Sequence, residues 1–291
     1  MSRWPSRLRW TARWTVVVPL VAGVLALWST PAALASTVSC DGHPATIVGT
    51  PGRDVLDGTS GADVIVGLGG GDLLRGGGGN DIICGGGFPD ELIGGRGDDR
   101  LFGEAGADSL FGNAGADALL GGEGLDTLSG GPDDDAVHGG KGRDDIWMDR
   151  GDDLMGGGAG RRDQIEAFMG QSLSLTVDLT SGTATGLGHD RVFGVENLDF
   201  SAHPGPTRLV GSDIHNRILA QGDPVVIRGR GGNDHLSGGG FGDQIRGGSG
   251  DDSLLGFRGD DDLDGGIGTD RLDGGRGTDT CTRGELLMHC P

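Results

Sequence analysis

Carboxylate side chains recur at a fixed interval through much of this 291-residue chain. From Gly49 to Gly156 the sequence divides without a gap into twelve rows of nine residues, such as GLGGGDLLR and GGEGLDTLS, and the sixth residue of every row is Asp. A second block, from Gly229 to Thr282, adds six rows with the same Asp. The candidate ligands are Asp54, Asp63, Asp72, Asp81, Asp90, Asp99, Asp108, Asp117, Asp126, Asp135, Asp144, Asp153, Asp234, Asp243, Asp252, Asp261, Asp270 and Asp279.

This spacing favours the binding of cations. If two rows form one coil, each Asp lies above the Asp two rows away, at a strand spacing of about 4.8 Å. Carboxylates that close repel one another unless a cation lies between them. Carboxylate and turn carbonyl oxygens suit Ca²⁺ better than Zn²⁺, and the seven His residues show no ligand spacing. The pattern therefore predicts Ca²⁺ as the cofactor, with ten sites in the first block and four in the second.

The remaining row positions predict the structure that holds these aspartates. Glycine at positions 1, 2 and 4 allows a tight turn every nine residues. The last three residues of a row read as a short strand, whose apolar residue at position 8 points inward while positions 7 and 9 face solvent. A coil of two rows buries too little apolar surface alone, so coils must stack. The predicted fold is all-β, a parallel β-roll or β-solenoid.

Six segments follow from these patterns: a signal peptide (1–35), an N-terminal cap (36–48), a first β-roll block (49–156), a metal-poor β spacer (157–210), a second block (211–282) and a C-terminal cap (283–291). Alternating Thr, Val and Leu predict strands in the spacer, which continues the solenoid or forms a small separate domain. The two rows before Gly229, from Gly211 to Arg228, carry Asn216 and Val225 in place of Asp, so we expect no full metal site there.

The first 35 residues have the composition of an export signal. Four Arg precede an apolar run, and Ala33 and Ala35 supply an A-x-A cleavage site. A membrane anchor is the alternative, but the run from Thr15 to Leu27 contains Pro19 and is shorter than the roughly 20 residues that a span requires. We therefore expect a secreted protein with no membrane span in its mature form.

Charge and cysteine content agree with export. The whole chain carries a net charge of −20, and removing the signal leaves 43 acidic side chains against 19 basic ones. Nucleic acid and anionic lipid are therefore disfavoured as partners. Four Cys in an exported chain predict two disulfides with three connectivities. We favour Cys40–Cys84 and Cys281–Cys290, because each pair lies at one end of the array.

The rows resemble the GGxGxDxUx nonapeptide of hemolysin-type (RTX) calcium-binding repeats. The resemblance covers the twelve rows of the first block and the six of the second. It implies that the first six residues of a row form a calcium-binding turn and the last three a strand. It also implies that the position-6 Asp residues are ligands, helped by turn carbonyls.

Some rows depart from the repeat. GGGFPDELI, GGPDDDAVH, MDRGDDLMG and GGGFGDQIR replace glycines or add charges, so we expect weaker sites at their aspartates, which are Asp90, Asp135, Asp153 and Asp243. After a one-residue slip, GRRDQIE offers Asp163 as a weaker candidate still.

Catalysis is not expected. The sequence contains no HExxH and no GxSxG, and little chain remains outside the signal and the repeats. Two classes are left: a calcium-binding module that folds in extracellular Ca²⁺, and a calcium-dependent adhesin or matrix component that binds carbohydrate or a cell surface. Trp147 is the one Trp outside the signal, and no exposed aromatic row favours adhesion. We favour the first class, and a cell-surface or glycan partner stays unidentified.

Overall fold

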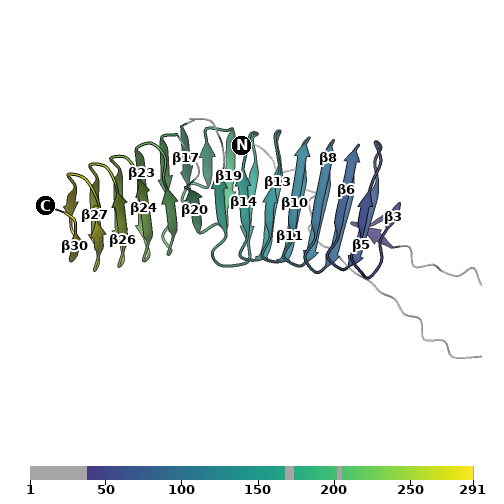
Figure 1. Ribbon diagram of the computed structural model, residues 1–291, viewed down its shortest axis with the longest axis horizontal. Coiled ribbons are helices and arrows are strands. Elements are labelled where there is room, and N and C mark those ends of the chain that lie inside the picture. The colour runs from purple at the N-terminus through teal and green to yellow at the C-terminus, as the bar shows by residue number, and fades with distance from the viewer. Residues whose placement is uncertain (1–37, 168–173, 202–204, 291) are drawn as a thin grey trace, which may run out of the picture.

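The computed structural model describes residues 38–167, 174–201 and 205–290, and within these ranges the chain forms strands and turns but no helix. The predicted signal peptide lies outside the described residues. The strands stack side by side along one axis, from β3 (Ile47–Val48) at one end to β30 (Leu286–Met288) at the other (Figure 1). In these ranges no helix offers the length and apolar character needed to cross a membrane.

The roll has two long sheets, and the chain alternates between them. The 13-stranded sheet contains β4 (Val55–Asp57), β6 (Leu73–Gly78), β8 (Glu91–Arg96), β10 (Ser109–Ala114), β12 (Thr127–Ser129), β14 (Asp145–Met148), β16 (Gln164–Ala167), β20 (Asn197–Phe200), β22 (Arg217–Ala220), β24 (His235–Gly239), β26 (Ser253–Phe257), β28 (Arg271–Asp273) and β30. The 15-stranded sheet contains β3, β5 (Val64–Gly69), β7 (Ile82–Gly87), β9 (Arg100–Ala105), β11 (Ala118–Gly124), β13 (Ala136–Gly142), β15 (Leu154–Gly158), β19 (His189–Phe193), β18 (Thr183–Thr185), β17 (Leu175–Asp178), β21 (Thr207–Val210), β23 (Val225–Gly231), β25 (Gln244–Ser249), β27 (Asp262–Ile267) and β29 (Thr280–Thr282).

The register confirms the predicted coil of two rows. Within each block, a strand pairs in parallel with the strand 18 residues further along, so that Leu74 lies beside Leu56 on one side and Leu92 on the other. The position-8 side chains of each sheet form a column, and the two columns pack together between the sheets, with Leu74, Leu92 and Leu110 fully buried. The predicted parallel β-roll is therefore confirmed.

The expectation that position 9 faces solvent is wrong for Ser237 and Asp264 in the second block and for three residues near the N-terminus. Val66, Cys84 and Phe102 are buried on the outer face of the 15-stranded sheet. They are covered because the antiparallel pair β1 (Ser39–Cys40) and β2 (His43–Pro44) lies beside β5 and β7, and a disulfide joins Cys40 to Cys84. The second predicted disulfide, Cys281–Cys290, is also present.

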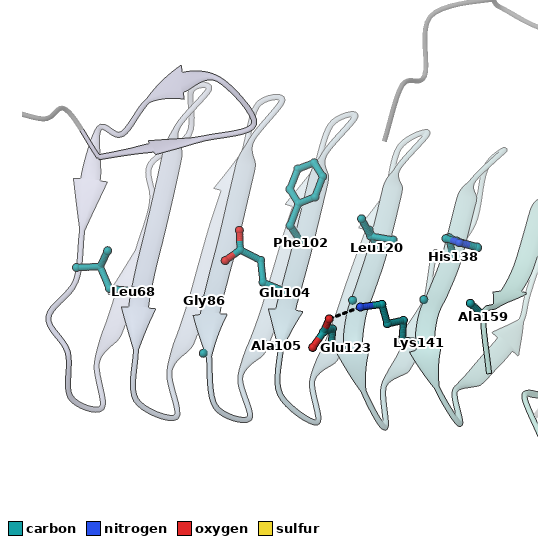
Figure 2. Close-up of a pocket in the computed structure, with 13 residues that line it drawn as sticks. Leu68, Gly86, Phe102, Glu104, Ala105, Leu120, Glu123, His138, Lys141 and Ala159 are labelled. Atoms are coloured by element: carbon teal, nitrogen blue, oxygen red, sulfur yellow. Dashed lines mark hydrogen bonds and ion pairs between the residues drawn. The ribbon is translucent and has the colours of Figure 1, made fainter. Parts of the chain in front are cut away.

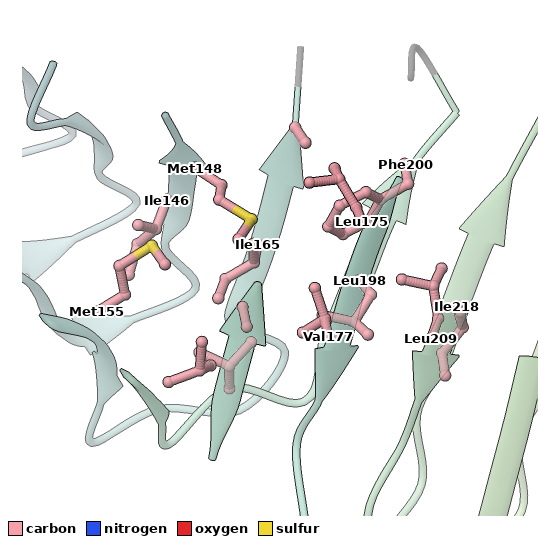
Figure 3. Close-up of a cluster of buried hydrophobic side chains, with 14 of the residues drawn as sticks. Ile146, Met148, Met155, Ile165, Leu175, Val177, Leu198, Phe200, Leu209 and Ile218 are labelled. Atoms are coloured by element: carbon pink, nitrogen blue, oxygen red, sulfur yellow. The ribbon is translucent and has the colours of Figure 1, made fainter. Parts of the chain in front are cut away.

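The spacer continues both sheets. β16 pairs in parallel with β20 and β20 with β22, so the 13-stranded sheet runs through without a break. In the other sheet, β18 runs antiparallel between β17 and β19, which adds two strands there. Larger residues fill the core at this level, including Met148 and the fully buried Phe200 (Figure 3).

Stacked turns approach one another closely at particular glycines. Gly86 has a φ of +114°, and a Cβ added there would lie 2.2 Å from the carbonyl oxygen of Leu68 in the preceding coil. A Cβ added at its neighbour Gly87 would have no such atom within 4 Å. Adjacent residues in one turn therefore differ in their need for glycine.

We predict that Gly86→Ala lowers the free energy of unfolding by about 2 kcal/mol or more, because a side chain in the left-handed region is strained and meets backbone atoms. Gly87→Ala should change it by less than about 0.5 kcal/mol. Urea unfolding in saturating Ca²⁺ measures both variants. Equal effects would show that the close stacking of turns does not limit stability.

Candidate metal centre

The position-6 aspartates line the two edges of the roll as hydrogen-bonded ladders. In each ladder the backbone N–H of one Asp donates to Oδ1 of the Asp one coil further on, as from Asp72 to Asp90 (2.7 Å) and from Asp90 to Asp108 (2.9 Å). Ladder I precedes the strands of the 13-stranded sheet and ladder II those of the 15-stranded sheet. The stacking predicted from the row spacing therefore brings the aspartates together in two lines.

Ladder I runs the length of the roll, with one change of bonding in the spacer, where the side-chain amide of Asn216 donates to the backbone oxygen of Glu196. Its members, which are acids apart from Asn216, are Asp54, Asp72, Asp90, Asp108, Asp126, Asp144, Asp163, Glu196, Asn216, Asp234, Asp252, Asp270 and Glu285. Ladder II is interrupted at the spacer. Its members are Asp63, Asp81, Asp99, Asp117, Asp135, Asp153 and Asp190, followed in the second block by Val225, Asp243, Asp261 and Asp279.

Each of seventeen aspartates in these ladders has one buried oxygen without a hydrogen bond. Oδ1 accepts the ladder bond, whereas Oδ2 has no partner among the described residues. These bare oxygens belong to Asp72, Asp81, Asp90, Asp99, Asp108, Asp117, Asp126, Asp135, Asp144, Asp153, Asp163, Asp190, Asp234, Asp252, Asp261, Asp270 and Asp279. A buried carboxylate oxygen without a partner is costly, so a group absent from the chain itself must compensate.

Four ladder positions lack this bare oxygen because their own turn satisfies it. The N–H of position 2 donates to Asp54 from Thr50 (2.6 Å), to Asp63 from Thr59 (2.7 Å), to Asn216 from Ser212 (2.7 Å) and to Asp243 from Gly239 (2.7 Å). We call these four turns closed, and the turns of the seventeen bare aspartates open.

Backbone conformation at position 2 separates the two kinds of turn. The φ angle there sets how the N–H of position 2 is oriented relative to the rest of the turn. Sixteen of the seventeen open turns place a left-handed residue there, and none of the closed turns does. The sixteen are Leu68, Gly77, Gly86, Gly95, Glu104, Asn113, Gly122, Gly131, Gly140, Gly158, Gly186, Arg230, Gly248, Phe257, Gly266 and Gly275.

Five of these sixteen residues are not glycine, and their φ angles lie between 74° and 87°. They are Leu68, Glu104, Asn113, Arg230 and Phe257. A left-handed conformation costs a residue with a Cβ about 1–2 kcal/mol. Strain of this kind persists where the surrounding structure or a ligand requires it. The open turn is therefore a conformation that the fold maintains at a cost.

Glycine at position 1 leaves room for the bare oxygen. A Cβ on Gly67 would lie 2.5 Å from Oδ2 of Asp72 and 2.6 Å from the carbonyl oxygen of Gly85. The same contacts recur at Gly94, 2.4 Å from Oδ2 of Asp99. A side chain at position 1 would thus fill the space beside the carboxylate, where carboxylate and carbonyl oxygens gather.

Burial makes the ladders hard to ionise without a cation. Desolvation, together with the charges of neighbouring aspartates, raises the pKa of Asp99 and of Asp108 to about 7. The pKa of Asp135 rises to about 8 for the same reasons. In the closed turn of Asp63 the pKa is instead lowered, because the Thr59 hydroxyl donates to the carboxylate.

The predicted ligands divide between these two environments. Fifteen of the eighteen carry a bare oxygen, including Asp90, Asp135 and Asp153 from rows that depart from the repeat. Asp54, Asp63 and Asp243 lie in closed turns. Their roles as ligands stay predictions.

Two aspartates in the spacer also have a bare Oδ2. Asp163, expected to be weak, carries a bare oxygen like the others, and Asp190 was missed by sequence reasoning. The stretch TGLGHDRVF contains the repeat signature around Asp190, but 37 residues separate it from Asp153, which is not a multiple of nine. A search that allowed the register to change would have found it.

The donor set fits Ca²⁺. It consists of buried carboxylate oxygens beside backbone carbonyls, and no imidazole or thiolate has a place in either ladder. Hard oxygen donors in a turn of adjustable geometry match the coordination that Ca²⁺ prefers. The bare Oδ2 atoms are the oxygens that would hold the ion.

A separate groove of about 730 Å³ runs along the outer face of the 15-stranded sheet (Figure 2). Leu68, Phe102 and Leu120 line it, and Lys141 forms an ion pair with Glu123 at its edge. The lining is mostly apolar, and its titratable residues are Glu104, Glu123, His138 and Lys141.

Comparison with known proteins agrees with the ladder geometry. The chain matches the family described as RTX calcium-binding nonapeptide repeat (4 copies) over overlapping segments that together cover residues 48–161 and 210–281. No curated protein matches it. The matched segments contain fifteen of the seventeen bare aspartates and make up more than half of the sequence. The chain therefore belongs to the RTX calcium-binding nonapeptide repeat family.

Proposed function

We propose that this protein is an exported calcium-binding module whose β-roll folds when Ca²⁺ fills the two ladders. The seventeen buried, bare carboxylate oxygens carry the proposal. A cation between stacked carboxylates replaces repulsion with attraction and supplies the missing partner of each Oδ2. Because the stacked arrangement exists only in the folded roll, the free energy of binding contributes directly to folding.

The number of ions follows from the open turns. A site needs two bare oxygens in neighbouring coils, and there are seven such pairs in ladder I and six in ladder II. Thirteen Ca²⁺ ions would bring 26 positive charges to a chain that carries a net −24 once its first 35 residues are removed. Full loading therefore nearly neutralises the protein.

Export is supported by the two disulfides, which form and persist in oxidising compartments. The proposal includes no catalytic activity, because the buried acids are spaced as a continuous ladder rather than as an isolated acid–base pair. The proposed function is therefore the calcium-dependent folding of the roll itself.

Removing one open-turn carboxylate should abolish calcium sites. We predict that Asp108→Asn lowers the number of bound Ca²⁺ ions by up to two, because Asp108 is shared between the pairs with Asp90 and with Asp126. Isothermal titration calorimetry measures the stoichiometry, and circular dichroism measures the gain of β structure on adding Ca²⁺.

Asp63→Asn is the matched control. It changes the same repeat position in a closed turn, where Thr59 already satisfies the carboxylate, so the stoichiometry should stay unchanged. Equal losses in the two variants would contradict the division into open and closed turns. A wild-type spectrum that Ca²⁺ leaves unaltered would contradict calcium-driven folding.

The metal-free roll should be more stable in acid. Most of its ladder aspartates have raised pKa values, up to about 8 at Asp135, so the folded state binds more protons than the unfolded chain between about pH 4 and pH 8. This stabilisation is complete below the ordinary Asp pKa and is lost as the pH rises through 6 to 8. We predict that, in chelator, β structure measured by circular dichroism increases as the pH falls from 8 to 5.

Calcium and protons should compete for the same oxygens. The Ca²⁺ concentration that half-saturates the ladder sites, measured by calorimetry, should therefore rise as the pH falls from 8 to 6. A metal-free protein with most β structure at pH 8, or a half-saturating Ca²⁺ concentration independent of pH, would show that the ladder carboxylates are not the linked groups.

A further inference from the structure

The row MDRGDDLMG carries an acid that the repeat does not supply. Met148 occupies position 1 and Asp149 position 2, where most rows have glycine. Oδ2 of Asp149 accepts hydrogen bonds from the N–H of Gly131 (2.9 Å) and from the hydroxyl of Ser129 (3.2 Å). The preceding coil thus holds this carboxylate in a fixed position.

Asp149 lies beside a pair of ladder II. One oxygen from each of Asp135, Asp149 and Asp153 lies within 4.8 Å of the other two. Asp135 and Asp153 are 3% and 4% exposed, and each retains its bare Oδ2. Among the residues that the structure describes, this is the one place where three potential metal ligands gather in this way.

The turn of Asp149 is also the exception among the open turns. Asp149 is not left-handed, yet Oδ2 of Asp153 has no hydrogen bond. The oxygen is therefore bare in a turn that lacks the usual left-handed residue, and a third carboxylate lies next to it. Asp190, one coil further along ladder II, adds another negative charge nearby.

We propose that Asp149 converts the Asp135–Asp153 pair into a three-carboxylate calcium site that fills before the two-carboxylate sites. The inference rests on the calcium-driven folding proposed above. Oxygen sites gain affinity for Ca²⁺ as charged ligands are added and as the site becomes more rigid. Asp149 adds a charge, and its bonds to Gly131 and Ser129 add rigidity.

The position of this site determines which coils an early-bound ion would order. It lies between β13 and β15, where the first block meets the spacer and the 15-stranded sheet gains its antiparallel strand. In stacked repeats, order spreads from one unit to its neighbours. A coil fixed here by the first ion would give the first block and the spacer a surface on which to stack.

Trp147 provides a local reporter. It is 39% exposed and lines the same surface hollow as Asp149, about 350 Å³ in volume. Terbium(III), which takes oxygen ligands, luminesces when a nearby excited Trp transfers energy to it. Titrating the full chain with Tb³⁺ alone, and subtracting the signal of Trp147→Phe, isolates this site from the four tryptophans of residues 1–35.

Two variants make the test specific. Asp149→Asn removes the charge but keeps an oxygen that can accept from Gly131 and Ser129. Asp145→Asn removes a charge from β14, the strand that contains Trp147; Asp145 is as far from Trp147 in sequence as Asp149 is, and it belongs to neither ladder. We expect Asp149→Asn to raise the Tb³⁺ concentration at half-maximal signal by about tenfold or more, and Asp145→Asn by less than about twofold.

In the wild type, the Trp147-dependent signal should saturate at about one Tb³⁺ per chain, before the circular dichroism change is complete. Identical titrations of the two variants, or a luminescence signal that rises only with the whole spectrum, would overturn the early-filling site while leaving calcium-driven folding intact. A wild type that binds neither Tb³⁺ nor Ca²⁺ would overturn both proposals.

Discussion

The repulsion between stacked, buried aspartates is the constraint on which the rest of this structure depends. Two unit charges about 4.8 Å apart repel by about 3 kcal/mol at the effective dielectric constant found near a protein surface. The ladder bond from each Asp N–H to the next Oδ1 neutralises only part of this cost, because Oδ2 stays bare. Each coil buries two apolar residues, and this burial gives the roll little free energy with which to offset the repulsion.

The turn backbone decides where a cation is needed. In a closed turn the protein satisfies the second carboxylate oxygen itself, as Thr59 does for Asp63. In an open turn a left-handed residue at position 2 leaves the oxygen bare, even where that residue is Phe257 or Leu68 and is strained. The closed turns lie at the N-terminal end and around the start of the second block. Calcium dependence is therefore distributed unevenly along the roll.

The regular parts of this architecture were predictable because each repeat position has one physical role. Asp at position 6 and Leu or Ile at position 8 predicted the coil, the ladders and the core, and end placement predicted both disulfides. Three features could not be read from a strict nine-residue register. Asp190 follows a change of register, the cap covers Phe102 through long-range packing, and Asp149 gains its neighbours only from stacking. Thr50 and Thr59 also close their turns through backbone conformations that their residue types do not dictate.

Anomalous diffraction from crystals grown with Ca²⁺ tests the central claim most directly, because it locates each ion. Calcium peaks are expected beside bare Oδ2 atoms of neighbouring open turns, such as those of Asp90 and Asp108, and none beside Asp54, whose turn is closed. Peaks spread equally over open and closed turns would contradict the role given to the backbone. Water in place of calcium beside the bare oxygens would contradict the account as a whole.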